Sequence, residues 1–134
     1  MIKECFIPKK VESLNKFIFG AGSRIIVSSR TKRFTINRAY TKYRNSWYNN
    51  IFALIQTPDQ KCQSKAIVEI TFYKKGQKYD FENFVGGCKP ILDALTKLGW
   101  IVDDNDKWIE VKYAQLSAKQ EKKEVGVNLK IIWT

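Results

Sequence analysis

The clearest pattern in this sequence is a helical seam flanked by strand-like segments. Five apolar residues recur at steps of four, three, four and three positions: Phe84, Cys88, Ile91, Leu95 and Leu98. That spacing matches one face of an α-helix, and the glycine that follows, Gly99, is typical of a helix end. Pro90 lies inside the seam and removes one backbone hydrogen bond. We therefore expect a kink or an irregular first turn around Gly86 and Gly87.

Alternating apolar and polar residues predict strands on both sides of this helix. The longer segments are residues 66–73, 108–116 and 125–133, and two shorter ones are residues 1–10 and 24–27. The polar connection 117–124 joins the last two long segments. These two are therefore expected to pair as antiparallel neighbours.

A second helix is predicted in the first half of the chain. Aromatic and aliphatic residues recur there at three- and four-residue steps: Tyr40, Tyr43, Trp47, Ile51, Leu54 and Ile55. Asn37 is available as the N-cap, and residues 57–59 as the end. No linker divides the chain, so residues 1–134 are expected to form one α+β domain. Its sheet is expected to be mixed or antiparallel, with about four to five strands and two main helices.

The composition excludes several kinds of chemistry. The chain has no histidine, which rules out nucleophiles activated by a histidine base and zinc sites that contain histidine. Cys5, Cys62 and Cys88 are too widely spaced for a zinc cluster and odd in number for a disulfide framework, so they indicate a reducing compartment. Any catalysis has to use carboxylates, lysines, tyrosines or a metal held by oxygen ligands.

Localisation and partner class follow from hydropathy and charge. No stretch approaches the ~20 consecutive apolar residues of a membrane span, and the first residues lack a secretory signal. We therefore expect a cytoplasmic protein without a membrane partner. A net charge of +11 and a pI near 9.6 point to a polyanion, with nucleic acid ahead of an anionic membrane surface.

The charge is distributed unevenly. Residues 13–58 contain eight basic residues and no acid, whereas residues 80–110 contain seven of the 13 acids and only three lysines. Carboxylates weaken phosphate binding unless a cation offsets them, and a divalent metal would do so. Metal-holding acids within a basic surface are what phosphodiester hydrolysis requires. For any single acid, helix capping or a surface ion pair is the alternative explanation.

The acids form two clusters. Asp80 and Glu82 project to one face of an extended segment, where their charges repel unless a cation lies between them. Asp103 and Asp104 follow the helix and a short strand, and a strand–helix–strand connection would return one of them beside the first pair. Two or three carboxylates suffice for Mg²⁺. Lys89 lies between the clusters in the sequence, where an ammonium would stabilise the charge on a reacting phosphate.

Two other readings of these residues are weaker. A calcium-binding loop at residues 103–106 fails, because the sixth position from Asp103 is Trp108 where such loops need glycine. Glu110-Val111-Lys112 matches the acid-x-lysine of PD-(D/E)xK nucleases, but amphipathic strands often contain such a tripeptide.

Taken together, five short segments resemble the RusA family of Holliday junction resolvases. The family pattern is D-x-D-N, a lysine, D-A-L, a glycine and D-D. The matching segments are Asp80-Phe81-Glu82-Asn83, Lys89, Asp93-Ala94-Leu95, Gly99 and Asp103-Asp104, with looser similarity at residues 13–15 and 43–44. Glu82 stands where the family pattern has aspartate. Five residues separate Asn83 from Lys89, where the short form of the motif has two.

The resemblance implies roles for these residues. Asp80, Glu82 and Asp104 would be catalytic metal ligands, Lys89 a catalytic lysine, and Asp103 and Asn83 accessory residues. It also implies a homodimeric endodeoxyribonuclease that cuts four-way DNA junctions in recombination and repair, with Mg²⁺, or alternatively Mn²⁺, and no small-molecule cofactor.

DNA contacts are expected from basic side chains of the first half of the chain. These are Lys16, Arg24, Arg30, Lys32, Arg33, Arg38 and Arg44. Two alternatives remain open: a non-catalytic nucleic-acid-binding module, and a nuclease that prefers flap or Y-shaped DNA.

Overall fold

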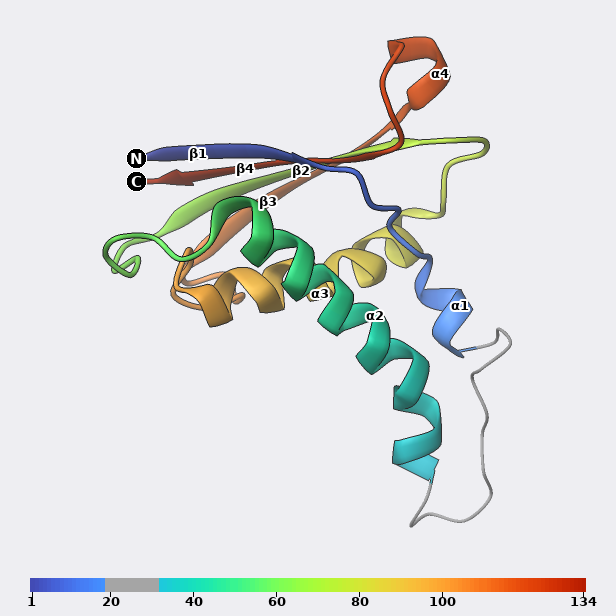
Figure 1. Cartoon of the computed structure of the whole chain (residues 1–134), viewed down its shortest axis with the longest axis horizontal. Coiled ribbons are helices and arrows are strands. Elements are labelled where there is room, and N and C mark those ends of the chain that lie inside the picture. Colours follow the sequence, from blue (N-terminus) through green and yellow to red (C-terminus); the bar gives the residue numbers. More distant parts are fainter. Residues whose placement is uncertain (19–31) are drawn as a thin grey trace.

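The computed structural model describes residues 1–18 and 32–134, and the side chains of residue 18 and of residues 32–37 lie outside this description. Within these residues the elements are β1 (Ile2–Ile7), α1 (Leu14–Ile18), α2 (Lys32–Ile55), β2 (Ala66–Lys74), α3 (Phe81–Leu98), β3 (Ile109–Ser117), α4 (Ala118–Glu121) and β4 (Gly126–Trp133). Helices α1, α2 and α3 lie on one face of the four-stranded sheet (Figure 1). The predicted single α+β domain is confirmed.

The core lies between this face of the sheet and the helices. Alternate residues of β2 point into it, and Ala66, Val68, Ile70 and Phe72 are fully buried. The predicted seam of α3 meets them, since all five of its apolar residues are buried. Full burial of each valine, leucine, isoleucine or phenylalanine among them contributes about 1.5–3 kcal/mol to folding. The periodicity of the sequence therefore predicted correctly which faces are buried.

The order of strands in the sheet is β1-β4-β2-β3, and it corrects one prediction. Strand β2 pairs in parallel with β3 and antiparallel with β4, so β3 and β4 are not neighbours as predicted. The reason is the helical crossover. Helix α3 returns the chain parallel to β2 on one edge, which leaves the other edge of β2 for β4. Alternation specifies which face of a strand is buried but not which strand pairs with it.

The first long helix begins earlier than predicted. Helix α2 starts at Lys32, so Asn37 lies inside it and is not its N-cap. No glycine or proline stands between these two positions to stop the helix. The predicted short strand at residues 24–27 lies outside the described residues. None of the helices in the described part of the chain is long and apolar enough to cross a membrane.

Helix α3 runs unbroken through Pro90, so the irregular turn expected at Gly86 and Gly87 is not observed. These glycines instead let the segment before α1 lie directly on the helix. A Cβ atom at Gly87 would come within 1.9 Å of the carbonyl oxygen of Glu12, and one at Gly86 within 2.8 Å of the Leu14 side chain. Only residues without side chains permit this approach.

The chain reverses direction at the end of α3. Gly99 adopts a left-handed conformation with φ of 89°, and the amide of Trp100 donates to the carbonyl of Leu95 at 2.9 Å. The short strand expected just before Asp103 is absent. The amide of Trp100, at the start of this segment, bonds to the end of the helix instead, so it cannot pair with a neighbouring strand.

Candidate functional site

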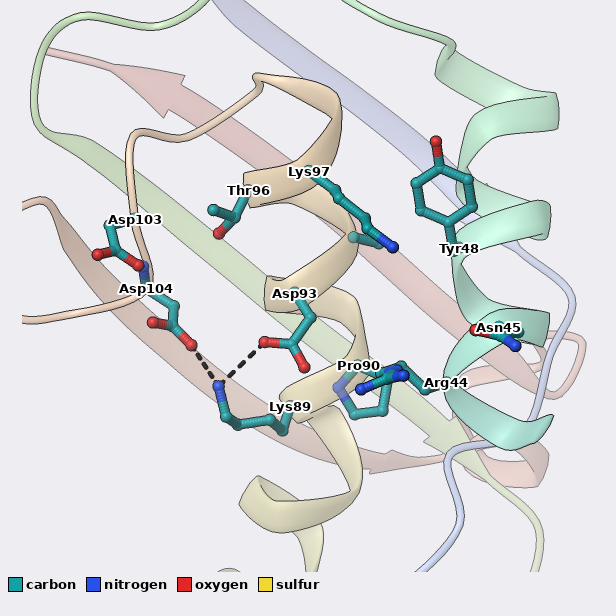
Figure 2. A pocket seen from close by; sticks show the side chains of 11 residues that line it. Arg44, Asn45, Tyr48, Lys89, Pro90, Asp93, Thr96, Lys97, Asp103 and Asp104 are labelled. Atoms are coloured by element: carbon teal, nitrogen blue, oxygen red, sulfur yellow. Dashed lines mark hydrogen bonds and ion pairs between the residues drawn. The ribbon is translucent and has the colours of Figure 1, made fainter. Parts of the chain in front are cut away.

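Lys89 connects two acids that come from different elements. Its ammonium donates a hydrogen bond to Oδ1 of Asp93 at 3.0 Å and another to Oδ2 of Asp104. Asp93 lies one turn further along α3, and Asp104 belongs to the loop that leads into β3 (Figure 2). The three side chains form an ion-pair cluster, with Lys89 about half exposed.

Electrostatics keep this cluster charged. Partial burial by itself lowers the pKa of Lys89, but the hydrogen bonds to Asp104 and Asp93 outweigh it and hold that pKa above its usual value. The hydrogen bond from Lys89 in turn lowers the pKa of Asp104. Lys89 is therefore a hydrogen-bond donor and not a base at neutral pH. An ammonium has three N–H donors, and the third is left for an anion such as a phosphate oxygen.

A pocket of about 450 Å³ opens beside the cluster, between α2 and α3. Arg44 and Tyr48 of α2 line one wall, and Lys97 of α3 lies 5.4 Å from the centroid of the Tyr48 ring (Figure 2). Asp103 and Asp104 line the other side. The pocket thus combines an acid–lysine cluster with a basic and aromatic wall.

Short-range hydrogen bonds fix the loop that carries Asp104. The carboxylate of Asp103 accepts from the amide of Asp104 at 2.7 Å and from the side chain of Asn105 at 3.1 Å. The side chain of Asn105 accepts in turn from the amide of Lys107 at 3.1 Å. These bonds are typical of Asx turns. Asp103 therefore holds this loop in shape.

Asp80 and Glu82 lie at the start of α3. Asp80 is the N-cap residue, although its carboxylate makes no capping hydrogen bond, and Glu82 is in the first turn. Two hydrogen bonds of 3.0 Å join the backbone of the preceding residue, Tyr79, to the side chain of Gln115 on β3. Asn83 is half-buried in the same turn. The first acidic segment is thus anchored to β3.

Tyr113 of β3 borders both acidic segments. Its ring lies edge-on to Phe81, the residue between Asp80 and Glu82, with 6.0 Å between the centroids. Burial raises the pKa of Tyr113 to about 12, and the charges of Lys89 and Asp104 also act on its hydroxyl. Tyr113 and Asp104 also line one pocket, so both acidic segments lie near this tyrosine.

The residues predicted to bind a metal do not converge. Among the described residues, no group of three or more acidic or cysteine side chains is placed to hold a metal ion. Asp80 and Glu82 are at the N-terminus of α3, whereas Asp104 is bonded to Lys89 in its middle. As placed, the set Asp80, Glu82 and Asp104 does not fit Mg²⁺, which needs several oxygen ligands around one point.

The predicted DNA-binding residues occupy different places. Arg44 lines the pocket, Arg38 lies in a polar groove along α2, and Lys16 forms an ion pair with Glu12 at 3.3 Å. Lys32 and Arg33 are in the first turn of α2, without a description of their side chains. Arg24 and Arg30 lie outside the described residues. The structure thus brings Arg44, Lys89, Asp103 and Asp104 together at one pocket.

Three residues of the site were given no role from the sequence: Asp93, which belongs to the matching segment Asp93-Ala94-Leu95, and Tyr48 and Tyr113. Asp93 follows Lys89 by four residues on a predicted helix, which is the spacing of a helical ion pair. That signal could have identified it. Tyr48 and Tyr113 come from elements remote in the sequence, and no local pattern marks them.

Compared with known proteins, the chain matches no family model and no curated protein sequence.

Proposed function

We propose that this chain is an endodeoxyribonuclease that cuts four-way DNA junctions, of the type found in the RusA family, and that it acts in the cytoplasm in recombination and repair. The observation that carries the proposal is the cluster of Lys89, Asp93 and Asp104 in a pocket walled by Arg44 and Lys97. An ammonium between carboxylates, next to further cations, suits a phosphodiester group.

The residues of the pocket have distinct roles in this proposal. Arg44 and Lys97 bind backbone phosphates, and Lys89 donates its remaining hydrogen bond to an oxygen of the reacting phosphate. Asp93 and Asp104 orient the ammonium, and Asp103 holds the loop in place. The adjacent helix α2 has no acidic residue to oppose a DNA strand.

A requirement for Mg²⁺, with Mn²⁺ as a substitute, is part of the proposal and rests on the motif resemblance. The arrangement described above does not form the metal site. A homodimer is also part of the proposal, because a four-way junction is two-fold symmetric and symmetric cutting needs two sites related by a dyad.

Cleavage assays test the proposal directly. The wild type and the variants Asp80→Asn and Asp104→Asn are incubated with a synthetic four-way junction, a Y-shaped DNA and a linear duplex, in Mg²⁺ and in EDTA. We expect the wild type to cut the junction only in Mg²⁺, and both variants to bind it without cutting. Asp59→Asn, an exposed acid in the loop after α2, is the matched control and should cut like the wild type.

The other outcomes distinguish the alternatives. Retention of all three DNAs without any cleavage would identify a non-catalytic binding module. Comparable cutting of Y-shaped or linear DNA would identify a nuclease with broader preference. Cleavage by Asp104→Asn at the rate of the wild type would refute the site as proposed, and the same result with Asp80→Asn would refute the metal requirement that rests on the motif resemblance.

A further inference from the structure

One face of the sheet has no helical layer over it. Helices α1, α2 and α3 all lie on the opposite face, and only the short helix α4 rises on this side, at one end of the sheet (Figure 1). We call this surface the open face. Residues that lie directly opposite one another on neighbouring strands form rows on this face. Each row runs across β1, β4, β2 and β3 in that order.

The middle row of the open face alternates in charge. In that order it consists of Glu4, Lys130, Glu69 and Lys112, each directly opposite the next in the register. The ion pairs in the described part of the chain all lie elsewhere. Among the side chains of this row, only that of Glu4 forms a hydrogen bond within the described residues, and it accepts this bond from the side chain of Asn128 at 2.8 Å.

The rows on either side are largely apolar or neutral. One consists of Ile2, Ile132, Ile67 and Glu110, and the other of Phe6, Asn128, Thr71 and Ala114. None of the side chains in the three rows is buried, and Ile2 is 64% exposed. Three isoleucines side by side on an exposed sheet face favour a covering partner.

Symmetry selects the partner. In a face-to-face pair of sheets with a two-fold axis parallel to the strands, the order of strands is reversed in the second copy. Glu69 then faces Lys130 of the second copy, and Glu4 faces Lys112, so every charge in the row meets its opposite. A two-fold axis along the row would instead place each charged residue opposite the same residue of the second copy, so like charges would meet. The alternating row is therefore self-complementary about one axis only.

The inner contacts of the neighbouring rows fit the same axis. Ile132 faces Ile67 of the second copy and Phe6 faces Ala114, while Asn128 faces Thr71. The outer pair, Ile2 and Glu110, brings an apolar side chain opposite a carboxylate at the edge of the sheet. Sheets stacked in this way lie about 10 Å apart with nearly aligned strands, as in β-sandwiches. The isoleucines supply the buried apolar area, and the charges determine the orientation.

We propose that the open face binds a second copy of this chain, with the two-fold axis parallel to the strands. In that dimer the loops with Asp103 and Asp104, which precede β3, lie toward the same end. The proposal specifies the surface of the homodimer included in the proposed function. It is tested without DNA, so that dimerisation and cleavage can fail separately.

Charge reversal tests this arrangement. Glu69→Lys and Lys130→Glu each create two like-charge contacts by symmetry, and each should raise the dimer dissociation constant at least about 100-fold in sedimentation velocity. An equimolar mixture of the two variants restores both contacts as opposite charges and should form a heterodimer. Lys42→Glu reverses the charge of an exposed residue of α2, which lies on the opposite face of the sheet (Figure 1), and should remain dimeric like the wild type.

Thermal unfolding by circular dichroism establishes that each variant is folded, and Glu69→Gln with Lys130→Gln provides a milder pair if a reversal does not fold. A wild type that is monomeric at about 100 µM, where even weak dimers form, would overturn the proposal. So would a mixture that stays monomeric while both variants are folded. If the Glu69→Lys variant pairs better with the wild type than with Lys130→Glu, the proposed two-fold axis parallel to the strands is wrong.

Discussion

The hydroxyl of Tyr43 on α2 donates a hydrogen bond to the carbonyl of Gly87 on α3 at 2.8 Å. The same hydroxyl accepts one from the amide of Glu12 at 2.9 Å. Tyr43 is buried, so it joins three segments that are far apart in the sequence inside the core. Burial raises the pKa of Tyr43 far above its usual value, which keeps the hydroxyl protonated and able to donate.

Replacing Tyr43 by phenylalanine should destabilise the protein by about 2 kcal/mol, because a buried carbonyl and a backbone amide lose their partner. Urea unfolding followed by tryptophan fluorescence measures the change. Tyr48→Phe is the control on the same helix. Within the described residues the hydroxyl of Tyr48 has no hydrogen-bond partner, so its loss should change stability by less than about 0.5 kcal/mol. Equal effects of the two changes would contradict the role given to Tyr43.

Adding a methyl group to Gly87 should cost about 3 kcal/mol or more, because its Cβ would lie 1.9 Å from the carbonyl oxygen of Glu12 and would force the backbone apart. Gly86→Ala is the matched comparison. Its Cβ would lie 2.9 Å from the Cβ of Leu14, which is a side-chain contact, and alanine favours the helix by about 1 kcal/mol. We therefore expect a smaller loss of stability for Gly86→Ala than for Gly87→Ala in thermal unfolding. A similar loss at both positions would argue against the backbone contact.

The pair between Lys89 and Asp104 should make stability depend on pH in the acid range. The pKa of Asp104 is lowered in the folded state, so its contribution is present above the unfolded value of about 3.9 and is lost as the pH falls through the folded value. At pH 7 the free energy of unfolding of the wild type should exceed that of Asp104→Asn by about 1 kcal/mol or less, because Lys89 is half exposed.

Urea unfolding at pH 7, 5 and 3 measures this difference, which should shrink toward zero at pH 3. Asp59 forms no ion pair with the described residues, so the effect of Asp59→Asn should not follow this trend. A difference between the wild type and Asp104→Asn that grows on acidification would refute the assignment.

Removing the guanidinium of Arg44 should weaken junction binding and lower the salt dependence of the affinity by about one counterion, if this side chain contacts a phosphate. Fluorescence anisotropy in EDTA at several salt concentrations gives the slope. Lys119→Ala on α4, on the opposite side of the sheet, should leave the slope unchanged (Figure 1). If Arg44→Ala leaves the salt dependence unchanged, Arg44 does not contact a phosphate and the DNA binds at another surface.

Local periodicity was sufficient for the buried faces of the chain. The seam of α3 and the alternation of β2 were predicted because burial repeats with the geometry of one helix or one strand. The end of α3 at Gly99 was predicted for the same reason, since a left-handed residue is a local property. The start of α2 was missed because asparagine is only weakly unfavourable inside a helix.

The sequence by itself determined the residue chemistry of the candidate site: a histidine-free chain with two acidic segments and a lysine on a helix between them. Only the tertiary structure decided that β2 lies between β3 and β4, and that Asp104 bonds to Lys89 rather than joining Asp80 and Glu82. The chain reverses at Gly99 and runs back along α3. This return brings Asp104 to Lys89, which lies roughly 13 Å along the helix axis from the end of α3. Strand order and this return depend on packing between distant segments, which local alternation and spacing do not encode.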